Sequence, residues 1–279
     1  MIGKKSSPKA ALPKSPVVGK IVDLLLKGVS TAKDLEALES LLLKYDPELE
    51  WRHIDDKVHN EGPIRINTDP VKVLAEVISN GFDAIIERAL DEERGPVNVS
   101  SPAEAAKLIG MGKNVLQSQS DLSDWFKKNM LKVTYLDSGI KASPTISVMD
   151  SGTGVHFDDF DVFFHLHHGS KTVKKHTIGE FGQGFRAVLP FCKGVVIASI
   201  AKHDDGRLSS LGVTILKEDS IDIDGECWTT YRCLAKGDWV ATAIDSRFLP
   251  SDLLVQGTSI TLVEYEAPQI KEYTTAGKN

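Results

Sequence analysis

Apolar and polar positions follow two different periods along this chain, and each period predicts one kind of element. Apolar side chains recur every three or four residues over 17–45 and again from Val73 to Ile86, which predicts helices in both segments. Asp69 is suited to cap the second helix, and Pro70 fits its first position. Runs with the character of strands are 132–136, 145–149, 195–200, 208–216, 228–234 and 256–265.

Three polar residues share one face of the second predicted helix. Glu76, Asn80 and Asp83 are four and three residues apart, so their side chains project from the same side. The amide oxygen of Asn80 is a suitable ligand for Mg²⁺, and the carboxylate of Glu76 can orient a water molecule. A solvated helix surface explains the same spacing, so this helix does not define a site by itself.

A carboxylate stands at the point where one predicted strand ends. Asp150 follows the strand 145–149, which a turn at 137–139 can join to 132–136 as a hairpin, and Gly152 and Gly154 come next. Such a carboxylate can accept a hydrogen bond from the exocyclic amine of adenine. An ordinary strand-end turn is the alternative interpretation.

A second glycine-rich segment follows, and its glycine spacing suits an anion. Glycines let backbone N–H groups approach phosphate oxygens closely, and a helix that begins there favours negative charge. No strand directly precedes this segment, so it is not a dinucleotide-binding fingerprint. The residues concerned are Gly179, Gly182, Gln183, Gly184 and Phe185.

The last strand begins with Gly257-Thr258. We expect the hydroxyl of Thr258 to brace Asp150, although threonine is common in edge strands for no functional reason.

Taken in order, these four segments resemble the nucleotide-site motifs of the GHKL ATPase superfamily over residues 68–265. Residues 76–84 are similar to the N-box, 150–154 to the adenine-binding box, 179–184 to the phosphate box and 257–258 to the last motif. A glutamate at position 76 resembles the hydrolytic branch, whereas sensor histidine kinases generally lack that base. This branch comprises the ninety-kilodalton heat-shock chaperones, gyrase B subunits, MutL proteins and microrchidia ATPases.

The resemblance implies a Bergerat-type ATP-binding fold, which is a two-layer α/β sandwich with a mixed, mostly antiparallel sheet. The ligands that it implies are ATP and Mg²⁺. Glu76 would then activate water, Asn80 would hold Mg²⁺, and Asp150 would bind adenine, while Asp83 would have a supporting role. Backbone groups of the phosphate box would stabilise the transferred phosphoryl group, and Lys171 of the lid is a candidate to reach the γ-phosphate.

The same resemblance gives the expected domain limits. A basic, disordered tail over 1–20 and an N-terminal helical extension over 21–67 precede an ATP-binding domain over 68–265. The domain would contain an insertion at about 92–131 and an ATP lid at about 157–177, and a tail over 266–279 would follow it. The extension could brace a partner subunit or pack on its own sheet, and we expect the packing.

The resemblance implies an ATPase whose lid closure controls association with a protein partner or a second copy. Only 266–279 follow the last motif, so a basic residue that activates hydrolysis in relatives would come from another chain or a longer protein, and hydrolysis alone would be slow. The alternatives are a nucleotide-gated binding module with negligible hydrolysis and a protein kinase of the histidine-kinase type. Chaperone, repair, chromatin and defence outputs are not distinguished by the fold.

Composition excludes some classes of protein. With 279 residues, 41% of them hydrophobic, the chain can bury a large core. Its net charge of −6 gives no indication of nucleic acid as a dedicated partner, although the basic tail leaves room for local contacts. No run is long enough to span a membrane, so we expect a cytoplasmic location, or a nuclear one in a eukaryote.

Histidines offer an alternative use of the lid region. Imidazole is a common ligand of transition metals, and five histidines lie between positions 156 and 176. No rigid element is evident to fix their geometry, so we expect a solvated or nucleotide-facing lid instead. These residues are His156, His165, His167, His168 and His176.

Overall fold

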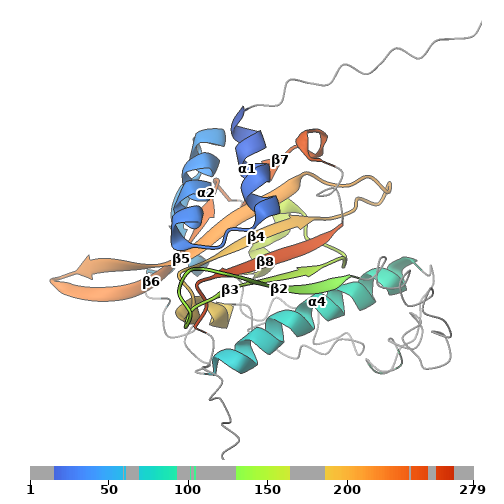
Figure 1. Cartoon of the computed structure of the whole chain (residues 1–279). Coiled ribbons are helices and arrows are strands. Elements are labelled where there is room, and N and C mark those ends of the chain that lie inside the picture. The colour runs from blue at the N-terminus through green and yellow to red at the C-terminus, as the bar shows by residue number, and fades with distance from the viewer. Residues whose placement is uncertain are drawn as a thin grey trace, which may run out of the picture.

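The computed structural model arranges the chain in three layers, with a sheet between two groups of helices (Figure 1). The residues that it describes are 16–58, 60, 69–92, 101, 104, 130–163, 186–238, 240–250 and 256–266. The predicted insertion therefore lies largely outside the described residues, as do most of both tails.

The central layer is an eight-stranded sheet in the order β1-β6-β5-β4-β8-β3-β2, with β7 beside β5. Every strand pairing in the described part of the chain is antiparallel. The predicted α/β fold is confirmed, although none of the parallel pairs of a mixed sheet occurs among these strands. The strands are β1 (Glu50–His53), β2 (Leu131–Leu136), β3 (Thr145–Asp150), β4 (Gly194–Ile200), β5 (Leu211–Ile223), β6 (Glu226–Ala235), β7 (Thr242–Ile244) and β8 (Gly257–Val263).

The predicted N-terminal helices cover one face of this sheet. They are α1 (Pro16–Lys27) and α2 (Ala32–Tyr45), and their apolar sides pack on β4, β5, β6, β7 and β8. The prediction of a disordered tail is wrong for 16–20, which begin α1 because Val18 is buried with Ile21 and Val22. Thr31 and Asp34 cap α2 reciprocally, which satisfies backbone N–H groups at its start. The N–H of Ala32 also donates to Oε1 of Glu264, just beyond β8, at 2.8 Å. The extension therefore packs on its own sheet, as expected.

The opposite face is covered by α4 (Pro70–Glu92), which lies along β3 and β2 in Figure 1. The predicted cap is confirmed, because the N–H of Val71 donates to Oδ1 of Asp69 at 2.9 Å. At the same end, the hydroxyl of Tyr265 donates to the carbonyl of Pro70 at 2.6 Å. Apolar side chains of α4 join the core on this side of the sheet.

Short 3-10 helices complete the described structure. They are η1 (Ile54–Asp56), η2 (Phe157–Phe163), η4 (Arg186–Phe191) and η5 (Ser246–Phe248). The helix expected to follow the phosphate box is η4, and it is only six residues long with Pro190 inside it. Proline has no N–H to donate and disfavours α geometry at the preceding residue, so the turn stays tight and short.

The β5–β6 hairpin is longer than the alternation predicts. Its outer part, residues 220–229, extends beyond the rest of the sheet as a two-stranded ribbon, which we call the β5–β6 arm (Figure 1). Asp224 and Gly225 form its turn with φ angles of 56° and 86°. Two consecutive residues with positive φ are typical of the tight hairpin turn that Asp-Gly favours.

None of the helices in the described part of the chain combines the length and the apolar character that a membrane crossing requires.

Candidate functional site

Three polar side chains form a row across adjacent strands on the α4 face of the sheet. The ladder pairs Asp150 of β3 with Thr258 of β8, and Thr258 with Ser199 of β4. All three residues are buried. The next row toward the core is apolar, with Val148, Ile260 and Ile197 at the corresponding positions. The polar row therefore closes the core at this end of the sheet.

Backbone groups hold the carboxylate of Asp150 in place. Its Oδ1 accepts a hydrogen bond from the N–H of Gly152 at 2.8 Å, and the N–H of Thr258 is a second donor. The Thr258 hydroxyl lies 2.9 Å from Oγ of Ser199, which also donates to the carbonyl of Gly257 at 3.0 Å. Thr258 thus supports Asp150 through its backbone N–H. The prediction that its hydroxyl braces Asp150 is wrong, because that hydroxyl bonds to Ser199.

Burial changes the acidity of this carboxylate. Asp150 is 7% exposed, and burial raises its pKa to about 7, against the opposing effects of the two N–H donors and of the charge on Arg88. A carboxylate in such surroundings is stabilised by any further hydrogen-bond donor that reaches it. The exocyclic amine of adenine is a donor of this kind.

Helix α4 approaches the Asp150 turn closely because two residues there are small. A methyl group on Gly152 would collide with the side chain and backbone of Ala84, while a Cβ on Gly81 would lie 2.9 Å from Cδ1 of Leu131 and make an ordinary contact, 3.4 Å, with Cβ of Asp150. The N–H of Thr153 donates to the carbonyl of Ala84 at 3.2 Å, which fixes the helix to the turn. The small residues of the first two motifs therefore belong to one contact.

The other glycine of the turn is required by its backbone conformation. Gly154 has a φ of 65°, and a Cβ there would collide with the carbonyl of Ile200.

The three polar residues predicted on α4 differ in their burial. Asp83 is 1% exposed, while Glu76 and Asn80 are half-buried. Both Asn80 and Asp83 have interactions with other groups, whereas Glu76 makes no hydrogen bond within the described part of the chain. An acceptor with unused hydrogen-bonding capacity is what the orientation of a water molecule requires.

The remaining predicted site residues lie outside the described residues. They are Lys171, Gly179, Gly182, Gln183, Gly184 and Phe185. Of the expected lid, only 157–163 is described, and it forms η2. Phe160 of η2 is fully buried, and its ring lies against Gly212 of β5. The first part of the expected lid is therefore packed on the sheet.

Three residues that stand out in the structure were not predicted from the sequence. Ser199 is the only polar residue in β4, which is a signal that could have been used. Arg88 lies one helical turn beyond Ala84, and its charge acts on Asp150. Arg186 follows the phosphate box directly and is 2% exposed, although arginine is rarely buried so completely.

Comparison with known proteins agrees with this geometry. A family model described as histidine kinase-, DNA gyrase B-, and HSP90-like ATPase matches residues 68–224, which is more than half of the chain. The matched segment includes α4 and Asp150. No curated protein matches the chain. The chain therefore belongs to the family of histidine kinase-, DNA gyrase B- and HSP90-like ATPases, which implies ATP as its nucleotide ligand.

Proposed function

We propose that this chain is a Mg²⁺-dependent ATPase of the hydrolytic branch of its family. The observation that carries this proposal is the position of Asp150, a buried acceptor at the end of β3, directly beneath the helix that bears Glu76 and Asn80. The end of β3 would therefore select adenine, and α4, which contacts it, would carry the phosphate chemistry.

Asp150 binds the adenine amine in this proposal. The N–H groups of Gly152 and Thr258 orient its carboxylate, and the bond between Ser199 and Thr258 keeps the β8 side of the row in place. A positioned acceptor loses little conformational freedom when the base binds, which favours affinity.

Asn80 and Glu76 serve the phosphate end. The side-chain amide oxygen of Asn80 would hold Mg²⁺, which when bound neutralises charge on the phosphates. Asn80 suits the binding of Mg²⁺, because it is only half-buried and lies one helical turn from Glu76. Glu76 orients the attacking water and accepts its proton.

The phosphate box and the lid complete the proposed site. The backbone between Gly182 and Gly184 would bind phosphate oxygens, and Lys171 would supply a positive charge. Phe160 packs on the sheet, so η2 would stay in place when the lid closes.

Lid closure would change the surface that a partner recognises, and we propose that a partner chain or a second copy responds to it. A ligand shifts such an equilibrium only if it binds the closed state more tightly than the open one. ATP contacts to the lid that ADP lacks would provide that difference.

The test is ATP binding and phosphate release by four variants with and without Mg²⁺. Glu76→Gln keeps binding and slows release by at least about a hundredfold, because general-base catalysis contributes that much or more. Asn80→Ala loses the part of ATP binding that depends on Mg²⁺. Asp150→Asn lowers the affinity for adenine nucleotides by at least about tenfold. Asp91→Asn, on the exposed end of the same helix, is the matched control and behaves like the wild type.

Different outcomes separate the competing functions. Tight binding without release by the wild type would favour a nucleotide-gated module. Transfer of phosphate to a histidine would favour the kinase. Equal loss of binding in Glu76→Gln, Asn80→Ala and Asp150→Asn, with folding intact, would contradict the proposed roles.

A further inference from the structure

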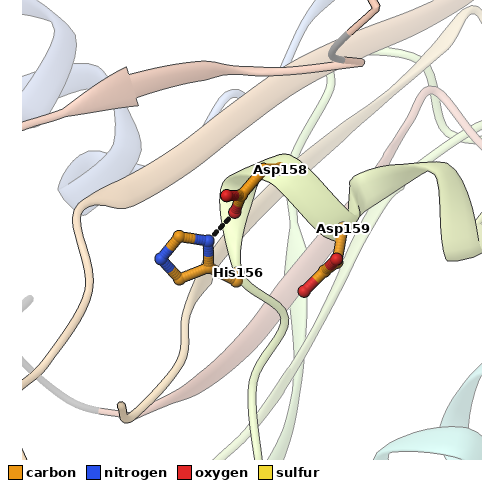
Figure 2. A group of neighbouring side chains, drawn as sticks. All are labelled: His156, Asp158 and Asp159. Atoms are coloured by element: carbon orange, nitrogen blue, oxygen red, sulfur yellow. Dashed lines mark ion pairs between the residues drawn. The ribbon is translucent and has the colours of Figure 1, made fainter.

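A histidine and two aspartates meet just after the Asp150 turn, at the start of the segment expected to form the lid. Their ligand atoms, one each from His156, Asp158 and Asp159, all lie within 4.8 Å of one another. Figure 2 shows Nδ1 of His156 ion-paired to Asp158, with the carboxylate of Asp159 next to this pair. We call these three residues the His-Asp cluster.

The chemistry of the cluster suits a divalent transition-metal ion. Zn²⁺ and its neighbours accept imidazole nitrogen together with carboxylate oxygen, whereas Mg²⁺ and Ca²⁺ prefer oxygen alone. Bonds of about 2.0–2.2 Å place neighbouring ligand atoms roughly 3.3–3.6 Å apart in a tetrahedral site. The His156–Asp158 pair is closer than this spacing and the other ligand atoms lie within 4.8 Å of one another, so a bound ion would separate the first pair and draw the third ligand in.

A second imidazole, from a distant part of the chain, lies against the ring of His156. The ring of His203 meets that of His156 edge-on, with their centroids 4.9 Å apart. His203 belongs to the loop between β4 and β5, so the sheet brings two segments with metal-binding chemistry together. Two imidazoles and two carboxylates are a complete ligand set for a four-coordinate ion.

The backbone on both sides of the cluster is fixed. The N–H of Val155 donates to Oγ of Ser199 at 2.8 Å, and the N–H of Asp159 donates to the carbonyl of His156 at 2.9 Å. On the other side, the N–H of His203 donates to the carbonyl of Arg207 at 2.8 Å. Ligands on fixed backbone require little ordering when a metal binds.

The cluster is also accessible. Both aspartates of the cluster are exposed, and His156 is half-buried. His203 lines an open groove of about 870 Å³ beside it, in which Asp205 and Asp245 are ion-paired to Arg207 and Arg247.

We propose that His156, Asp158 and Asp159 bind a divalent transition-metal ion such as Zn²⁺, with His203 as the nearest candidate for the fourth ligand. The ion joins the start of η2 to the loop between β4 and β5. It uses neither Asn80 nor Glu76, so this site is separate from the Mg²⁺ of the proposed ATPase.

The experiment measures Zn²⁺ by calorimetry and Co²⁺ by visible absorption on the metal-free full chain without nucleotide. Because His165, His167 and His168 could also bind these ions, they are first changed together to asparagine, and this triple variant is the reference. It binds one ion per chain with a visible Co²⁺ spectrum of four-coordinate nitrogen and oxygen ligation. His156→Gln, Asp158→Asn and Asp159→Asn each weaken binding at least about tenfold, and metal raises the unfolding temperature of the reference alone.

Asp161→Asn is the matched control, because it removes the same charge from the same short helix outside the cluster. It leaves binding unchanged. His203→Gln weakens binding if His203 is the fourth ligand, and unchanged binding by this variant overturns that assignment. Absence of saturable binding in the reference, or binding by His156→Gln, Asp158→Asn and Asp159→Asn as tight as that of the reference, overturns the proposal. Three independent variants keep the test valid if one of them fails to fold.

Discussion

Asp150 shows how one buried side chain links folding, proton binding and ligand choice. Its folded pKa of about 7 lies above the usual value of 3.8, so between these values the folded chain binds more protons than the unfolded chain. The stabilising contribution is therefore fully present below about pH 3.8 and is lost as the pH rises through about 7. A hydrogen-bond donor that binds the ionised carboxylate favours that form and so lowers the pKa of Asp150.

A pH-dependent affinity for adenosine follows, since adenosine has no phosphate that titrates. We expect wild-type affinity to rise between about pH 6 and about pH 8, because the ionised carboxylate is the better acceptor for the adenine amine. Calorimetric titration over this range measures it. Asp150→Asn, which cannot ionise, shows weaker binding without this slope. A wild-type profile as flat as that of the variant would rule out Asp150 as the acceptor.

At the level of helices and strands, close contacts decide where the site forms. Helix α4 reaches the Asp150 turn only because Ala84 and Gly152 are small at the point of contact.

We expect Gly152→Ala to lower the unfolding free energy by about 1–3 kcal/mol, since the added methyl group must displace α4 from the turn. Adenosine affinity falls with it, because the same displacement disturbs Asp150. Gly19→Ala is the control, as no atom lies within 4 Å of a Cβ at this position of α1, and alanine in a helix is favourable by roughly 0.5–1 kcal/mol. Chemical denaturation of both variants measures the difference. A stability of Gly152→Ala equal to that of the wild type would show that α4 and the turn can move apart without cost.

The elements that the sequence predicts well are those with strong local signals. Asp69 and Pro70 mark the start of α4, and alternation marks β2 and β3. The sequence did not predict the arm, because the buried run of β5 ends at Leu216. Backbone pairing with β6 nevertheless continues to Ile223, next to the Asp224-Gly225 turn. Ser199 was missed because its role depends on register with Thr258, which a single sequence does not encode locally.

For the whole molecule, the sheet carries two separate cores, one under each group of helices. The arm lies beyond both. An isolated two-stranded hairpin is only marginally stable, so the arm contributes little to global stability.

Two isoleucines on the same face of β5 test this division. Ile215→Ala, at 0% exposure in the body of the sheet, should lower the unfolding free energy by about 2–5 kcal/mol through loss of burial and the cavity left behind. Ile221→Ala, half-buried on the arm, should lower it by less than about 1 kcal/mol. Denaturant unfolding of the two variants compares identical substitutions on one strand. A large loss in Ile221→Ala would mean that the arm belongs to the cooperative unit.

The residues just after β8 connect both helical layers to one strand. Glu264 accepts from the first turn of α2, and Tyr265 donates to the first residue of α4. At the other end of the same strand stands Thr258, which supports Asp150. A displacement of β8 along its own axis would therefore pull on the starts of two helices on opposite faces of the sheet at the same time. The strand acts as a mechanical link between the polar row and both outer layers.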